Sequence, residues 1–269
     1  MMMSSLLVFA IVFVVKPPGV VDPVVDPIVR PPGVWWRYPS IGAAFTTQDG
    51  HMFTSIGKRF ALGTIFDDDL LKAQLGVDIN AWNTLNRIET DHFKLMFSDF
   101  LIAVPVMLRF GNLSAEIKFS HVSSHLGDGL FEFAALAGLA PRVFSKDFLT
   151  AFLSFDFKFD HFSVQEYVEG GWIHKATPDG LERLIFNFGG DVKFFVRKSI
   201  AYPWIAYDLS LNKSMGFDSG FNSTFQAGVA LNGLLNNLRI AFVMYSGLDH
   251  KGQLYDKKIQ YYGAGIFFD

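Results

Sequence analysis

Residues 148–159, FLTAFLSFDFKF, decide the fold, because apolar and polar side chains alternate along them with a period of two. One face carries Leu149, Ala151, Leu153, Phe155, Phe157 and Phe159, and the other carries Thr150, Ser154, Asp156 and Lys158. Successive side chains of a β-strand point to opposite faces, so this period predicts a strand. That strand has one apolar face and one polar face.

The same alternation recurs along the rest of the chain. Adding less regular stretches, the predicted strands are 41–48, 52–64, 72–82, 102–110, 112–124, 148–159, 162–173, 184–198, 201–211, 224–231, 236–246 and 257–268. Gly, Asn and Asp lie between several of them, as at 110–112, which is typical of hairpins. The count of about twelve is even, as in single-chain bacterial barrels.

Strand length and composition indicate where the apolar faces go. Strands of globular proteins average about 5–6 residues, whereas strands that cross a membrane need about 9–11, and the predicted segments are near the longer figure. The chain has 30 Phe and only 18% charged residues. We therefore predict an all-β, antiparallel transmembrane β-barrel of about 12 strands, with a soluble barrel or sandwich as the weaker alternative.

In such a barrel, lipid covers the Phe-rich faces and the polar faces line the lumen. Trp and Tyr are expected near strand ends, where they form girdles at the membrane interfaces. The candidates for these girdles are Trp35, Trp36, Trp82, Trp172, Trp204, Tyr245, Tyr261 and Tyr262.

Composition also excludes several classes of protein. The absence of Cys excludes a disulfide scaffold and a Cys-ligated zinc or iron–sulfur site. The net charge of −3 argues against a broad nucleic-acid-binding face. No glycine-rich nucleotide motif is present. We therefore expect no cofactor, no metal and no nucleic-acid partner.

Three regions are expected along the chain. Residues 5–15, SLLVFAIVFVV, are too short for a membrane-spanning helix and resemble the apolar core of a secretory signal, with a buried strand as the alternative. The predicted regions are a signal-like segment at 1–16, a Pro-rich extended leader at 17–39 and the outer-membrane β-barrel at 40–269. Within the barrel, 84–97 is expected to form a short surface helix or a long loop.

The end of the chain supports a barrel. Its last strand reads KKIQYYGAGIFFD, with Tyr262-Gly263 followed by Ile266 and Phe268 at alternate positions. This pattern resembles the C-terminal signal of bacterial outer-membrane barrels. Asp269 departs from it, because the aromatic residue is usually last. The location predicted on this basis is the bacterial outer membrane.

The most distinctive string runs from His121 to Asp128, HVSSHLGD. Together with the Asp-Pro pairs at 22–23 and 26–27, and GQLY at 252–255 before YYG at 261–263, it resembles an uncharacterised family of bacterial outer-membrane barrels. Gly129 stands where that family usually has an acidic residue, which weakens any role that needs paired carboxylates. The resemblance implies a fold and a location but no established activity.

The string also suggests chemistry, because His121, Ser123 and His125 share one face of their strand. If that face meets lipid, the His-x-Ser pair resembles that of the lipid A 3-O-deacylase barrel. Ester hydrolysis would then use His121 as base and Ser123 as nucleophile, with Asp128, or Glu132, orienting the imidazole.

Two other interpretations of the string stay open. In the first, these side chains satisfy loop backbone or line the lumen. In the second, they bind a metal, but His121 and His125 are four residues apart, a spacing that brings side chains together on a helix and not on a strand.

The function we predict first is a non-catalytic structural or accessory component of the outer membrane or of a larger membrane assembly. Its expected partners are outer-membrane lipid and lipopolysaccharide, with other membrane subunits as further candidates. The alternatives are a lipid-acting acyl-ester hydrolase that uses His121 and Ser123, and a narrow channel.

Overall fold

The computed structural model shows twelve β-strands and one short 3-10 helix in the part of the chain that it describes. The described residues are 27–29, 40–47, 51–68, 70–89, 92–127, 143–181, 183–195, 200–212, 220–231, 238–249, 252–254 and 257–268. The elements are β1 (Ile41–Thr46), β2 (His51–Asp67), β3 (Leu71–Glu89), β4 (His92–Phe110), β5 (Leu113–Leu126), β6 (Phe144–Lys158), β7 (Phe162–Thr177), β8 (Leu184–Phe194), β9 (Ala201–Asn212), β10 (Gly220–Leu231), β11 (Leu238–Leu248), η1 (Gly252–Leu254) and β12 (Lys258–Phe268). Residues 1–26 lie outside them, so the signal-like segment stays a prediction.

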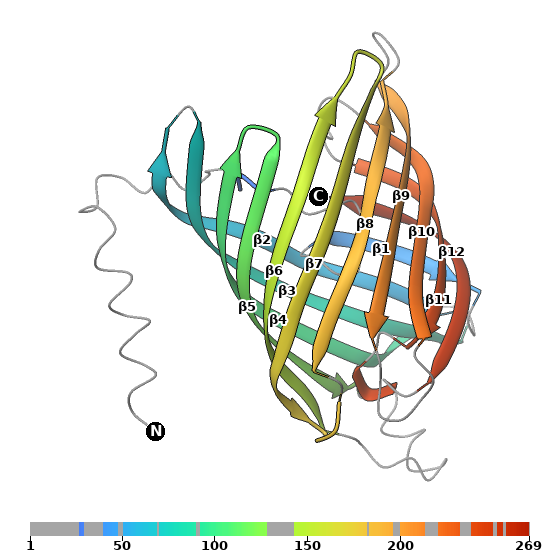
Figure 1. Cartoon of the computed structure of the whole chain (residues 1–269). Helices are drawn as coiled ribbons and strands as arrows, with labels where there is room; N and C mark the ends of the chain where they lie inside the picture. Colours follow the sequence, from blue (N-terminus) through green and yellow to red (C-terminus); the bar gives the residue numbers. More distant parts are fainter. Residues whose placement is uncertain are drawn as a thin grey trace.

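The strands form a closed antiparallel barrel in which each strand pairs with its neighbours in the sequence (Figure 1). Pairing of the first strand with the last closes the ring, from Ile41 opposite Phe268 to Thr46 opposite Gly263. The predicted fold class and the number of strands are therefore confirmed. Among the described residues, no helix combines the length and the apolar character needed to cross a membrane.

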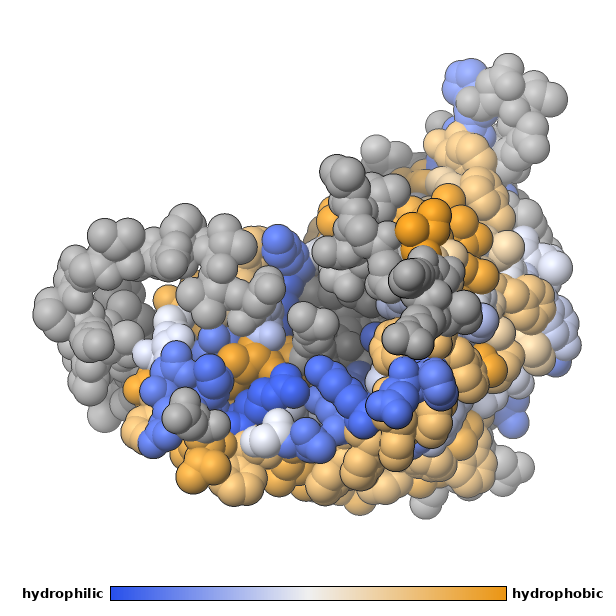
Figure 2. Space-filling view, turned by 90° about the horizontal axis from the view of Figure 1, so that it is seen from above, coloured by the Kyte–Doolittle hydropathy of each residue, from blue (hydrophilic) through white to orange (hydrophobic). Residues whose placement is uncertain are grey.

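The two alternating sets of side chains lie on different sides of the barrel: the apolar set on its outer wall and the polar set in its lumen. On β6, Leu149, Leu153 and Phe155 are 44–50% exposed, whereas Thr150 and Ser154 are 2% and 0% exposed. Seen from above, hydrophobic residues form the outer wall and hydrophilic residues lie at the rim and inside it (Figure 2). A barrel with this distribution buries its polar faces and presents its apolar faces outward, as transmembrane barrels do.

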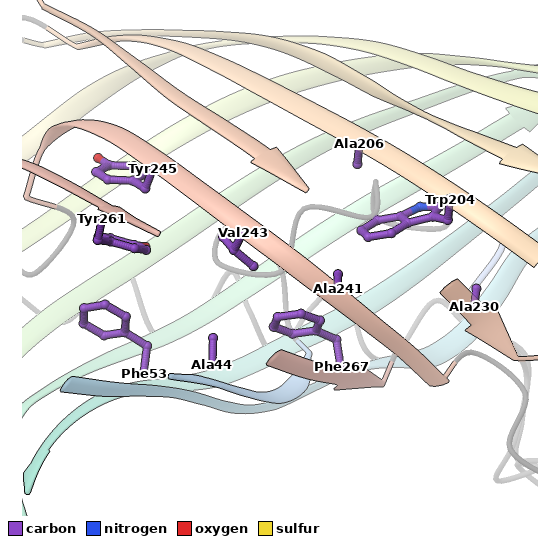
Figure 3. Packing of buried hydrophobic residues seen from close by; sticks show 10 residues of the cluster. All are labelled: Ala44, Phe53, Trp204, Ala206, Ala230, Ala241, Val243, Tyr245, Tyr261 and Phe267. Atoms are coloured by element: carbon purple, nitrogen blue, oxygen red, sulfur yellow. The ribbon is translucent and has the colours of Figure 1, made fainter. Parts of the chain in front are cut away.

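An aromatic cluster of buried side chains lies inside the barrel (Figure 3). Its members come from β1, β2 and β9–β12, and they are Ala44, Phe53, Trp204, Ala206, Ala230, Ala241, Val243, Tyr245, Tyr261 and Phe267. The Arg239 guanidinium lies 4.6 Å from the centre of a Trp204 ring. The expectation that Trp204, Tyr245 and Tyr261 form interfacial girdles is wrong, and so is that for Trp82, which packs against buried lumen residues. Trp35 and Trp36 lie outside the described residues. A barrel of this size has an interior that large side chains must fill.

A buried ion network also lies inside the barrel. Arg59 on β2 contacts Asp78 on β3 (Nη2 to Oδ2, 2.6 Å) and Glu116 on β5 (Nη1 to Oε2, 2.6 Å). Lys118 on β5 adds a second cation, with its Nζ 3.3 Å from Oε1 of Glu116. The two cations thus neutralise the two anions. Buried charges are tolerated in a protein only when they are paired in this way.

The two ends of the barrel differ in the length of their connections. At the end that joins β4 to β5, the connections are short, such as the turn at 111–112. At the end that joins β5 to β6, they include 127–143 and 249–257. The structure also corrects the expectation for 84–97. β3 continues to Glu89 and β4 begins at His92, so these residues extend two paired strands.

Candidate active site

His121 and Ser123 lie on the outer wall of the barrel. On β5, the residues that alternate with them, Ser120, Val122 and Ser124, are buried toward the lumen. The side chain of His121 is 44% exposed and shares its face with Ile117 and Phe119, which are themselves exposed. The orientation on which the hydrolase alternative depends is therefore present.

Asp147 on β6 is the acidic partner of His121. The two residues are directly opposite each other in the β5–β6 pairing, and Nδ1 of His121 lies 2.5 Å from Oδ1 of Asp147. An ionised carboxylate only accepts hydrogen bonds, so this contact keeps the proton on Nδ1. The other ring nitrogen, Nε2, is then left with a lone pair that can accept a proton.

The sequence-based choice of an acidic residue missed Asp147. Asp128 and Glu132, the acids proposed from the sequence, lie outside the described residues. The sequence did contain a signal for Asp147. This residue lies an even number of positions from Leu149 and Leu153, which face outward, so the alternation places it on the same outer face. An acidic residue in register with lipid-facing ones is costly unless it has a partner, and here the partner is His121.

Ser123 follows His121 by two residues on the same face. Two residues of an extended strand span about 7 Å, a distance that an imidazole and a hydroxymethyl group can bridge between them. Asp147 thus lies across the strand pair from His121, and Ser123 lies along β5 from it, so a carboxylate, an imidazole and a hydroxyl are neighbours on the outer wall. Serine hydrolases use these three groups, with the hydroxyl as nucleophile.

The surface beside these residues is apolar. On β4, Phe100 pairs with Ser123 and Ile102 pairs with His121, and both β4 side chains are exposed. Leu149 is the next outward residue after Asp147 on β6 and is also exposed. The Phe100 ring approaches His125 edge-on, with 5.6 Å between ring centroids. A hydrocarbon chain can therefore lie against the wall next to the Ser123 hydroxyl.

A polar belt continues from the site around the outer wall. It consists of Thr54, Asn83, Ser98, His125, Ser123, His121 and Asp147, which occupy neighbouring register positions on β2 to β6. Ser98 donates a hydrogen bond to Asn83 (2.7 Å), and Asn83 donates one to Thr54 (3.3 Å). The belt lies toward the end that joins β5 to β6, and its member Ser98 is 5% exposed.

A metal centre has no support in the described part of the chain. No group of three or more His, Asp or Glu side chains lies close enough there to hold a metal ion. His121 contacts Asp147, whereas His125 lies against Phe100. Their separation follows from strand geometry, in which residues four apart are about 13 Å from each other.

The chain belongs to the family described as "Protein of unknown function (DUF1207)", whose model matches residues 64–269. This confirms the resemblance to an uncharacterised family of barrels. The family has no described activity. No curated protein matches the chain.

Solved structures similar to this chain are outer-membrane barrels. An active-site variant of outer membrane phospholipase A from Escherichia coli is 11% identical, with a TM-score of 0.58, over 92% of this chain and 95% of that chain. The outer membrane phospholipase of Salmonella typhi is also 11% identical, with a TM-score of 0.58, over 91% and 94%. LpxR from Salmonella typhimurium is 8% identical, with a TM-score of 0.41, over 85% and 99%. The fold of this chain is thus that of outer-membrane β-barrels.

Proposed function

We propose that this protein is an acyl-ester hydrolase that acts on lipids in the bacterial outer membrane. The observation that carries the proposal is the contact between His121 and Asp147 on the outer wall, two residues along the strand from Ser123. A buried or lumen-facing His121 would have no access to lipid. On the outer wall, the same side chains meet the acyl chains of the membrane directly.

The reaction follows from the order of the three residues. Nε2 of His121 takes the proton of the Ser123 hydroxyl, and Oγ attacks the acyl carbonyl carbon. The ester C–O bond breaks, and the proton passes from His121 to the oxygen of the leaving alcohol. Water, deprotonated by His121, then attacks the acyl-serine; the acyl–Oγ bond breaks, the fatty acid leaves, and the proton on His121 returns to Oγ of Ser123. Asp147 orients the imidazole and stabilises its charged form throughout.

The position of the site along the barrel favours the outer leaflet. Bacterial outer-membrane barrels have short periplasmic turns and longer extracellular loops. The longer connections here, 127–143 and 249–257, are at the end that joins β5 to β6. His121 and Ser123 lie close to that end of β5, so substrate would come from lipids of the outer leaflet, including lipopolysaccharide.

The similar structures include enzymes that act on lipids, which is compatible with the proposed activity but is not evidence for it. Two of them are phospholipases, and their likeness to this chain concerns the fold. The non-catalytic alternative, a structural or accessory barrel, predicts the same fold without turnover. Measurement of acyl release distinguishes the two.

The test uses the full-length protein in mixed micelles with either a glycerophospholipid or hexa-acylated lipid A, and detects released fatty acid by mass spectrometry. We expect turnover of at least one substrate, and its loss in Ser123→Ala and His121→Ala. The matched control is Ser145→Ala, because Ser145 pairs with Ser123 across β5 and β6 and has no His beside it on its own strand. That variant keeps the activity.

A chemical probe gives a second readout. A fluorophosphonate reacts with activated serine hydroxyls and forms a stable adduct. We expect a single adduct on Ser123 in the wild-type protein and in Ser145→Ala, and none in His121→Ala. No acyl release and no adduct in folded wild-type protein would contradict the proposal and favour the non-catalytic alternative.

A further inference from the structure

Residues 27–29, from the Pro-rich stretch before the first strand, lie inside the barrel. The side chain of Val29 is buried, with 1% of the residue exposed. The backbone N–H of Ile28 donates a hydrogen bond to Oε1 of Gln74, a lumen-facing residue of β3 (2.9 Å). A segment that precedes the barrel in the sequence is thus held within its wall.

Two arginines bind the carbonyl groups of this segment. Nη1 of Arg109 on β4 donates to the carbonyl oxygen of Ile28 (3.2 Å). Nη1 of Arg59 on β2 donates to the carbonyl oxygen of Val29 (3.3 Å). Together with Gln74, these side chains satisfy both backbone groups of Ile28 and the carbonyl of Val29. Buried backbone groups require such partners, so these lumen side chains form a binding site for the backbone of this segment.

The positive charges of Arg59 and Arg109 are already balanced by acidic side chains. Arg59 has both Asp78 and Glu116 as counter-ions, and Arg109 lies 3.7 Å from Asp156 (Nη2 to Oδ2). The arginines therefore offer N–H donors without excess positive charge. These donors are used here by the carbonyl oxygens of Ile28 and Val29.

Apolar side chains complete the site. Val29 and Ile28 pack against Met107 on β4, Phe152 on β6 and Tyr167 on β7. The Phe152 and Tyr167 rings are stacked, with centroids 5.4 Å apart. These three residues alternate with outward-facing ones, so they form an apolar patch in a mostly polar half of the lumen. Val29 covers that patch and removes it from water.

We infer that residues 27–29 are a lumen plug, a permanent part of the folded protein that closes the barrel to solutes. The plug contacts β2, β3, β4, β6 and β7 and lies beside the buried ion network of Arg59, through which it is bound. The mature protein therefore retains these residues, and the wild-type barrel does not conduct ions. This inference is independent of the hydrolase proposal.

A designed disulfide tests the position of the plug. The natural chain has no Cys, so the double variant Val29→Cys/Met107→Cys carries only the two new thiols. After mild oxidation of the folded protein, we expect loss of both free thiols, measured by maleimide labelling after denaturation. The matched control is Val29→Cys/Ile117→Cys, because Ile117 lies beside this level of the barrel but points outward. Equal oxidation of the two pairs, or of neither, would overturn the proposed position.

Conductance in planar lipid bilayers tests the closing role. The full-length wild-type protein is compared with Ile28→Gly/Val29→Gly, which removes the side chains that fill the apolar patch. We expect no channel steps from the wild type and resolved steps from the variant. Equal conductance of the two proteins, whether open or closed, would show that these residues are not what closes the lumen. Acyl release by the same variant should stay at the wild-type level, since His121 and Ser123 are on the other side of the wall.

Discussion

Arg59 on β2 and Glu116 on β5 meet inside the lumen at 2.6 Å (Nη1 to Oε2), although β3 and β4 separate their strands in the wall. This contact, called the strut below, links two strands that are not neighbours in the barrel wall. Asp78 on β3 shares the same guanidinium, with Nε to Oδ1 at 2.7 Å. One side chain thus links three strands and also binds the lumen plug.

Removing this strut should destabilise the barrel. Arg59→Met leaves two buried carboxylates without their main counter-ion, and loss of one partner of a buried ion pair costs about 3–5 kcal/mol. Denaturant unfolding in lipid vesicles, followed by the heat-modifiable shift on a gel, measures the free energy of unfolding. The control is Lys72→Met, which removes the exposed contact with Asp67 and should cost less than about 1 kcal/mol. Similar losses in both variants would argue against the strut.

Substitution of Asp147 should lower the activity. Asp147→Ala removes both the acceptor for Nδ1–H of His121 and the charge that stabilises the imidazolium, whereas the amide of Asp147→Asn can donate to Nδ1 and favour the wrong tautomer. We expect kcat to fall in both variants, by about 10²-fold or more in Asp147→Ala. Acyl-release kinetics give kcat and KM separately. Unchanged kcat in Asp147→Ala would exclude this residue from the mechanism.

Tryptophan fluorescence should separate the outer wall from the lumen. Trp172 is 49% exposed on the outer wall, whereas Trp204 is fully buried in the aromatic cluster. In single-Trp variants reconstituted in lipids with brominated acyl chains, we expect strong quenching of Trp172 and little quenching of Trp204. Equal quenching of the two would contradict the inward position of Trp204.

A charge on the apolar wall should hinder insertion into lipid. Leu153 faces outward near the middle of β6, and an arginine at such a depth costs about 2–4 kcal/mol. We expect Leu153→Arg to lower the folded fraction in vesicles relative to the wild type. Asp160→Arg, in the exposed connection between β6 and β7, is the control and should fold normally. Normal folding of Leu153→Arg would mean that this face does not meet lipid.

Much of the fold could be predicted because alternation is a local property. Leu149 and Thr150 are neighbours with opposite environments, and the sequence alone assigns them to opposite faces. The same reasoning placed His121 and Ser123 on one face. The aromatic cluster was missed because Trp and Tyr are typical of membrane interfaces, although Trp204 shares its parity with Asp208 and Ser210, which are buried in the lumen.

The sequence did not predict the register of the β5–β6 pair or the contacts between segments that are far apart in the chain. Asp147 faces His121 across a hairpin with a long connection, and the length of a long connection does not determine the pairing. The contact of Ile28 with Gln74 and Arg109 joins segments that are 46 and 81 residues apart. Proline residues around Ile28 indicate only an extended chain, and they do not show that the lumen would bind it.

The shortness of β1 has a mechanical consequence. Its six residues pair at six positions with β12 and at five with β2, whereas β4 and β5 are paired at fourteen. Closure of the ring therefore depends on its least attached strand. Under force or in denaturant, the ring should open at β1 first, and the amide hydrogens of Ile41–Thr46 should exchange with solvent ahead of those of β4 and β5.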